Sequence, residues 1–177
     1  MPRGVLSRGA VWTFTAALAA LFVVASFRLN PLCGALSVPA LLIVFFYSLT
    51  KRFTWASHLV LGLALSIAPV GGWLAIAGHF APVPLWLAAA VGFWVAGFDT
   101  IYACQDAVFD QREGLFSIPA RFGVRPALVL ARAFHVLALG AMAAVGVAAS
   151  LHAVYWIGLV VVAGVLVAEH RLVRADD

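Results

Sequence analysis

Long apolar runs, separated by short polar breaks, fill almost the whole chain. Hydrophobic residues make up 65% of the 177 residues and charged residues only 10%, whereas a soluble domain is about half apolar and about a quarter charged. Too little polar surface remains to cover a water-soluble globule. Runs of about 20 apolar residues have the length that a helix needs to cross a bilayer, and no alternating pattern suggests a barrel. The chain is therefore predicted to be an all-α, polytopic membrane protein.

About six spanning helices are predicted from these runs. The expected ranges are 10–27, 32–49, 57–78, 85–105, 126–149 and 153–168. Pro69, Gly71 and Gly72 are expected to interrupt the third of them, and residues 107–125 are expected to form the one long loop. With no internal repeat and no linker composition, residues 1–177 are interpreted as a single membrane domain.

Arginine and lysine are distributed unevenly between the two ends of these helices. One side collects most of them, namely Arg3, Arg8, Lys51, Arg52, Arg112, Arg121, Arg125, Arg171 and Arg174. The other side has Arg28 alone. Because basic loops tend to stay in the cytoplasm, the basic side is predicted to be cytoplasmic. This bias also accounts for the net charge of +4, so nucleic acid is not a predicted partner.

Three carboxylates, Asp99, Asp106 and Asp110, follow one another at the end of the fourth predicted helix. On an α-helix, steps of seven and eleven residues return within about 20° of the starting direction. The three would therefore share one face if the helix continues to Asp110, with Tyr102 beside them. Asp99 lies about two turns inside the apolar run, where a carboxylate needs a partner or a water-filled cavity.

Two kinds of function fit this acidic stripe. Carboxylates that would otherwise repel one another can bind Mg²⁺, which takes one or two of them and leaves positions for water and phosphate oxygens. Basic residues at the same end could then contact a diphosphate, and these are Lys51, Arg52, Arg112, Arg121 and Arg125. A cation pathway or a proton relay could use Asp99 equally well. The spacing alone leaves diphosphate binding and transport open.

Other polar residues in the apolar runs are interpreted more simply. Arg132 and His135 share a helical face and could point toward Asp99, although Arg132 could instead extend to the membrane surface. His58 belongs to a scattered set of histidines without metal-ligand spacing and is assigned no role. Gly62 and Ser66 form a small-x-x-x-small pair, which predicts close helix packing.

A longer motif surrounds the aspartates. The pattern D-x-x-Y-x-x-x-D-x-x-x-D, then G-x-x-S-x-x-x-x-F-G, is met at Asp99, Tyr102, Asp106, Asp110, Gly114, Ser117, Phe122 and Gly123. It resembles the second aspartate-rich motif and following loop of the UbiA family of intramembrane prenyltransferases. Residues 47–54, YSLTKRFT, are similar to the Y-x-x-x-K-R helix end of that family. The resemblance covers essentially the whole chain and is strongest to bacterial quinone enzymes, 4-hydroxybenzoate polyprenyltransferase and its menaquinone-pathway relative.

The resemblance implies a function in the bacterial inner membrane. Family members hold Mg²⁺ on a polyprenyl diphosphate and transfer the polyprenyl group to an aromatic acceptor, here 4-hydroxybenzoate or a menaquinone precursor, in ubiquinone or menaquinone biosynthesis. The implied metal ligands are Asp99, Asp106 and Asp110. The implied diphosphate contacts are Lys51, Arg52 and Arg121. Tyr102 is implied as a catalytic residue in the cavity.

The chain departs from the family pattern before Asp99. The first family motif, N-D-x-x-D-x-x-x-D, is absent, since no aspartate precedes Asp99. The chain is therefore expected to correspond to helices three to eight of the nine-helix UbiA fold, without the first two and the last. One acidic helix supplies half of the charge that holds the metal, so little or no activity is expected from this chain alone. The alternatives are a second chain that supplies the missing helices and a non-catalytic membrane remnant or subunit.

Overall fold

The computed structural model describes residues 7–173, and within them the chain forms eight helices and no strand. The helices are α1 (Arg8–Leu29), α2 (Pro31–Thr50), α3 (Ser57–Ala77), α4 (Pro82–Ala103), α5 (Ala107–Arg112), α6 (Ile118–Phe122), α7 (Val124–Ala148) and α8 (Ala153–Leu172). All except α5 and α6 are long and apolar enough to cross a membrane. The prediction of an all-α, multi-pass membrane protein is confirmed, and a lipid bilayer is its surrounding partner.

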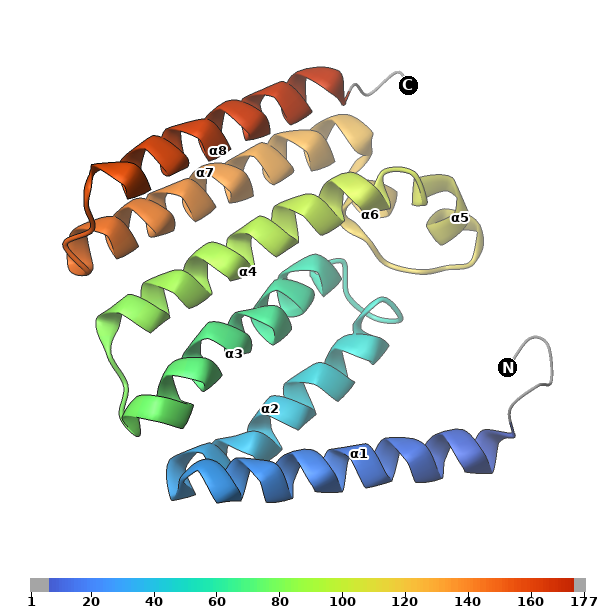
Figure 1. The fold of residues 1–177 in the computed structure, drawn as a ribbon. Coiled ribbons are helices and arrows are strands. Elements are labelled where there is room, and N and C mark those ends of the chain that lie inside the picture. The colour runs from blue at the N-terminus through green and yellow to red at the C-terminus, as the bar shows by residue number, and fades with distance from the viewer. Residues whose placement is uncertain (1–6, 174–177) are drawn as a thin grey trace.

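The six long helices lie side by side in the order α8, α7, α4, α3, α2, α1 (Figure 1). The long helices therefore lie in the order in which they follow one another along the chain, and α4 packs against α7 although the short helices α5 and α6 separate them in sequence. The two short helices lie at one end of the bundle, where α4 ends and α7 begins (Figure 1). The motif that follows Asp99 is therefore placed at one end of the bundle.

Small side chains pack the centre of the row. The fully buried alanines of α4 and α7 are Ala90, Ala96, Ala127 and Ala131. Gly62 on α3 approaches Gly92 on α4 so closely that a methyl group on Gly62 would meet the Gly92 carbonyl oxygen. Ser66, one turn further along α3, also packs against Gly92. Because helices in lipid associate mainly through such close contacts, the prediction of close packing at Gly62 and Ser66 is confirmed.

Two predicted features of the chain are wrong. The third helix is not interrupted, since α3 continues through Pro69 and ends only at Ala77, where Gly78 adopts a φ of 70°. Neighbouring helices and local adjustments can satisfy the backbone groups that a proline frees. Residues 107–125 are not one loop, because they contain α5 and α6. The second of these has Pro119 in its first turn, and Ser117 accepts a hydrogen bond from the Ala120 amide, which is a typical helix start.

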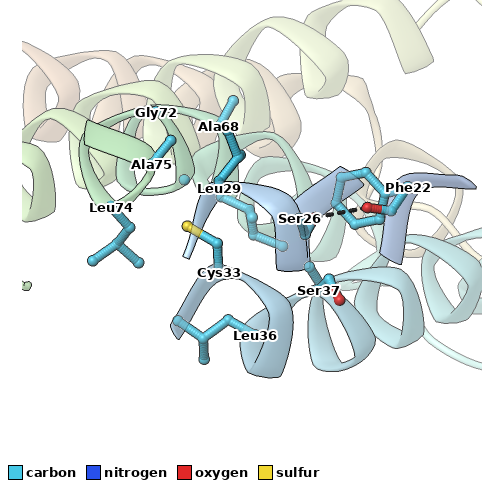
Figure 2. A pocket seen from close by; sticks show the side chains of 13 residues that line it. Phe22, Ser26, Leu29, Cys33, Leu36, Ser37, Ala68, Gly72, Leu74 and Ala75 are labelled. Atoms are coloured by element: carbon cyan, nitrogen blue, oxygen red, sulfur yellow. Dashed lines mark hydrogen bonds between the residues drawn. The ribbon is translucent and has the colours of Figure 1, made fainter. Parts of the chain in front are cut away.

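An apolar cavity of about 370 Å³ lies between α1, α2 and α3 (Figure 2). None of its lining residues carries a charge. Its two serines, Ser26 and Ser37, donate their hydroxyl protons to the carbonyls of Phe22 and Gly34 in their own helices. The cavity therefore offers an apolar surface, and the charged chemistry of the chain lies elsewhere, at the end of α4.

Candidate active site

A tight turn ends α4 before the second aspartate. The amides of Cys104, Gln105 and Asp106 each donate to the carbonyl three residues back, as in a 3₁₀ turn, and α5 then begins at Ala107. Such a turn has three residues per revolution instead of 3.6, so it changes the direction of the side chains that follow. The condition for three carboxylates on one continuous helical face is therefore not met.

Asp99 is paired with a histidine. Its Oδ2 lies 2.6 Å from Nδ1 of His58, the second residue of α3. The other ring nitrogen, Nε2, lies 3.3 Å from the backbone nitrogen of Ile118, the first residue of α6. A backbone amide can only donate, so Nε2 is the acceptor and the ring proton is on Nδ1. The imidazole therefore donates its hydrogen bond to the Asp99 carboxylate.

The role of His58 is missed by sequence reasoning. Asp99 is expected to need a partner, but His58 is 41 residues earlier in the chain and has no metal-ligand spacing. One signal could have found it, because an imidazole inside an apolar run is itself costly unless it is partnered. When two polar residues lie in apolar runs and neither has a polar residue close in sequence to pair with, they are candidates to bind each other.

Asp110 is buried and forms an ion pair. Its side chain is 2% exposed, and its Oδ2 lies 3.3 Å from Lys51 Nζ, whose side chain is 36% exposed. The backbone oxygen of Lys51 also accepts a hydrogen bond of 2.7 Å from the Phe116 amide. Lys51 thus joins the end of α2 to the segment between α5 and α6. Two residues predicted to bind different partners, metal and diphosphate, are in contact with each other.

The remaining predicted site residues are exposed. Asp106 and Tyr102 lie at or beside the turn after α4, and Tyr102 is 58% exposed. Arg52 is exposed, and so is Arg121, whose guanidinium lies 5.9 Å from the centre of the Phe122 ring. Over residues 7–173, the structure brings no three His, Cys, Asp or Glu side chains together as a set that could hold a metal ion.

The sequence matches a known family along its whole length. Residues 1–177 match the UbiA prenyltransferase family. The chain belongs to this family. The resemblance inferred from the motif at residues 99–123 is therefore confirmed.

Two relatives within the UbiA family are 4-hydroxybenzoate prenyltransferases by name. A 4-hydroxybenzoate octaprenyltransferase of Azoarcus sp. (strain BH72) is 33% identical over 172 residues, which are 97% of this chain and 59% of that protein. A mitochondrial 4-hydroxybenzoate polyprenyltransferase of Arabidopsis thaliana is 36% identical over 142 residues, which are 78% of this chain and 34% of that protein. This UbiA chain thus spans 59% or less of the length of these two relatives.

A solved structure supports the same assignment for the fold. The apo structure of a UbiA homolog from Aeropyrum pernix K1 matches this chain with a TM-score of 0.85 at 34% sequence identity. The match covers 96% of this chain and 64% of that one. The helices of this chain therefore adopt the UbiA arrangement.

The carboxylates of this UbiA chain fit part of a Mg²⁺–diphosphate site. Mg²⁺ usually binds one or two carboxylates and completes its shell with water and phosphate oxygens. Asp99 uses Oδ2 for His58, and its Oδ1 makes no bond within residues 7–173. The Asp106 carboxylate likewise makes no hydrogen bond or ion pair in this part of the chain. These two side chains therefore offer the hard oxygen donors that the ion requires.

Arg132 and His135 do not reach the aspartates. His135 Nδ1 lies 2.9 Å from Nε2 of His170 on α8, and Arg132 Nη2 lies 3.5 Å from the His170 carbonyl oxygen. The expectation that they could contact Asp99 is wrong, because both join α7 to α8.

Cys104, in the turn after α4, is not a nucleophile candidate. Burial raises the pKa of its thiol above the ordinary value, and a thiol reacts through its thiolate. The thiol instead donates to the Thr100 carbonyl oxygen at 3.3 Å. Both cysteines are free.

Proposed function

We propose that this UbiA chain takes part in the transfer of a polyprenyl group from a polyprenyl diphosphate to an aromatic acceptor, 4-hydroxybenzoate or a menaquinone precursor, in quinone biosynthesis. One observation carries the proposal. An exposed carboxylate, Asp106, follows the His58-bound Asp99 at one end of an otherwise apolar bundle. This arrangement suits a lipid substrate whose tail is apolar and whose head group is a metal-bound diphosphate. The relatives named above carry the same activity in their names.

Each site residue has a proposed part in this reaction. Asp99 and Asp106 would hold Mg²⁺, which when bound would neutralise the diphosphate and assist its departure. The carbon–oxygen bond of the substrate breaks with its electron pair on the diphosphate. The electron-rich acceptor ring forms the new carbon–carbon bond and then loses a proton. Tyr102, exposed at the same end, is the proposed catalytic residue near the reacting carbon.

The basic residues of the site would meet the charge that Mg²⁺ leaves on the diphosphate. Arg52 and Arg121 are exposed and can turn toward a ligand. Lys51 is already paired with Asp110, so we propose that it contributes to the diphosphate site while it holds Asp110. Asp110 would then act less as a direct ligand than Asp99 and Asp106, because its carboxylate is buried against Lys51.

We further propose the bacterial inner membrane as the location, with the α5 and α6 end in the cytoplasm. The basic residues that lie at this end of the helices are Arg8, Lys51, Arg52, Arg112, Arg121, Arg125 and Arg171. Arg28 lies at the opposite end, in the last turn of α1. Positive residues favour the cytoplasmic side. Arg3 and Arg174, which belong to the same predicted bias, lie outside the described residues.

The test is prenyl transfer in membranes that contain the chain, with Mg²⁺, a polyprenyl diphosphate and 4-hydroxybenzoate. The chain is assayed alone and in a form extended with two preceding family helices, since the described residues do not complete a metal site. We expect transfer in the extended form, and a loss of about 10²-fold or more for Asp106→Asn, the usual scale for removing one electrostatic group from an active site. Glu113→Gln, an exposed neutralisation on the same segment, is the matched control.

Two results would contradict the proposal. Transfer that is unaffected by Asp106→Asn would contradict the proposed role of Asp106 as a metal ligand, on which the proposal rests. Cation flux through Asp99 that does not respond to prenyl diphosphates would instead support the transport alternative. Full activity of the chain alone would contradict the narrower expectation that the first family motif is required.

A further inference from the structure

One buried imidazole joins three separate elements of the fold. His58 is 0% exposed at the start of α3, Asp99 is on α4, and Ile118 starts α6. The ring donates from Nδ1 to Asp99 Oδ2 at 2.6 Å and accepts at Nε2 from the Ile118 amide at 3.3 Å. Both ring nitrogens are therefore used, and a flipped or doubly protonated ring would lose the Ile118 bond.

The segment from α5 to the start of α6, which contacts His58, is hydrogen-bonded to residues of the candidate site at several positions. The Leu115 amide donates to the Asp110 carbonyl oxygen at 2.8 Å, and the Phe116 amide donates to the Lys51 carbonyl oxygen at 2.7 Å. The Ile118 amide then donates to His58. The backbone between α5 and α6 is thus fixed by bonds to residues around the proposed diphosphate site.

We propose that His58 is a positioning residue for the diphosphate site. Its Nδ1–H holds the Asp99 carboxylate, and the Ile118 amide fixes the orientation of its ring. The inference rests on the proposed function. With Oδ2 held by His58, the free Oδ1 of Asp99 is presented in one direction, and the carboxylate does not have to be ordered when Mg²⁺ binds. A metal ligand that is oriented by a second residue in this way loses about 10–100-fold in metal affinity when that residue is removed.

Two substitutions separate the two bonds of the ring. The amide nitrogen of asparagine is attached to Cγ, as Nδ1 of histidine is, so His58→Asn keeps a donor toward Asp99 and loses the acceptor for Ile118. The amide oxygen of glutamine reaches about as far as Nε2, so His58→Gln keeps the acceptor and loses the donor at the Nδ1 position. His58→Ala removes both, and His152→Ala, at an exposed position next to α8, is the matched control.

The readout is binding rather than turnover. The purified chain and its form extended with two preceding family helices are each heated with inorganic pyrophosphate while MgCl₂ is titrated. The Mg²⁺ concentration at half of the thermal stabilisation is measured for both. We expect His58→Gln and His58→Ala to raise this concentration by about 10-fold or more, and His58→Asn and His152→Ala to leave it close to that of the unchanged chain. In hydrogen exchange, the peptide containing Ile118 should exchange faster in His58→Asn than in His58→Gln.

The outcomes separate this inference from the proposed function. If neither the unchanged chain nor its form extended with two preceding family helices shows Mg²⁺-dependent stabilisation by pyrophosphate, the proposed function fails, and the positioning role fails with it. If the unchanged chain is stabilised, Asp106→Asn is not, and His58→Gln behaves as the unchanged chain does, the function stands and the positioning role is overturned.

A further measurement needs no variant at His58. In the unchanged chain, Mg²⁺ and pyrophosphate should slow hydrogen exchange at the Ile118 amide, because a ligand on Asp99 also restrains the ring that accepts from this amide. Stabilisation of the protein without slower exchange at Ile118 would overturn the inference.

Discussion

The helices at the centre of the row and those at its edges are all apolar enough to span a membrane, but their surroundings differ (Figure 1). Within the spanning windows, 33% of α4 and 39% of α7 is buried in the protein, against 6% of α1 and 6% of α8. Apolar character alone does not explain this burial, since α7 is as apolar as α1 and α4 is the least apolar of the six spans. Side-chain size differs between them, because five of the nine buried residues of α7 are alanine or glycine, whereas many valines of α8 are exposed. In a bilayer, apolar character specifies a span, and small residues specify which span is central.

A methyl group at the centre of the row should have the largest effect on stability. Gly62→Ala would place its Cβ against the Gly92 carbonyl oxygen, and backbone cannot move aside as a flexible side chain can. We expect a loss of about 1–3 kcal/mol in the free energy of unfolding, the range for overpacking. The midpoint of detergent-induced unfolding, followed by circular dichroism, measures it.

The matched substitution is at the edge of the row. Gly164→Ala on α8 has nothing within 4 Å of the new methyl group, so its effect should stay within about 0.5 kcal/mol. Equal losses for Gly62→Ala and Gly164→Ala would contradict the distinction between central and edge helices.

Removing the cation at the polar end should have an effect of similar size. Lys51→Met would leave the buried Asp110 carboxylate without its ion-pair partner. Breaking a fully buried pair lowers the free energy of unfolding by about 3–5 kcal/mol. Because the Lys51 side chain is 36% exposed, we expect a loss of about 1–3 kcal/mol for Lys51→Met. Thermal unfolding in detergent checks this. Arg112→Met, at an exposed position of α5, should change the midpoint little, and an equal loss there would show that the Asp110 pair is not special.

The attachment of α1 and α2 to the rest of the row should give the smallest effect. Asn30 accepts from the Cys33 amide at 2.9 Å and donates to the Leu74 carbonyl oxygen of α3 at 2.8 Å. Asn30→Ala loses both bonds, for which we expect about 1–2 kcal/mol. Asn30→Ser keeps a helix cap without reaching Leu74, so its unfolding midpoint should lie between that of the unchanged chain and that of Asn30→Ala. A midpoint equal to that of Asn30→Ala would mean that capping contributes nothing here.

Most of the fold was predictable from local patterns. The six spans were expected within a few residues of where they lie, because span length follows from bilayer thickness. The two short helices were not, since each is held by contacts rather than by apolar periodicity. In α5, for example, the buried Asp110 is bonded to Lys51, 59 residues earlier. Pro69 was misleading because α3 stays continuous through it, as the surroundings of a membrane helix allow.

The candidate site was predictable as a set of residues and not as a geometry. The motif spacing identified Asp99, Asp106 and Asp110, but it assumed one continuous helix. The 3₁₀ turn at 104–106 separates them into a histidine-bound, an exposed and a lysine-bound carboxylate. The backbone hydrogen bonds of a single turn decided this separation, and nothing in the local composition predicts them.

The sequence by itself determined that residues 7–173 hold six helices long and apolar enough to cross a membrane, and that the chain belongs to the UbiA family, because apolar length and motif spacing are properties of short stretches. The tertiary structure alone decided that α4 lies against α7 and that His58 holds Asp99. These facts depend on contacts between residues far apart in the chain, such as Ile118 and His58, which are separated by 60 positions. In lipid each helix satisfies its own backbone, so the sequence can specify every helix without specifying its neighbour. Small residues and a few partnered polar groups then select the neighbour.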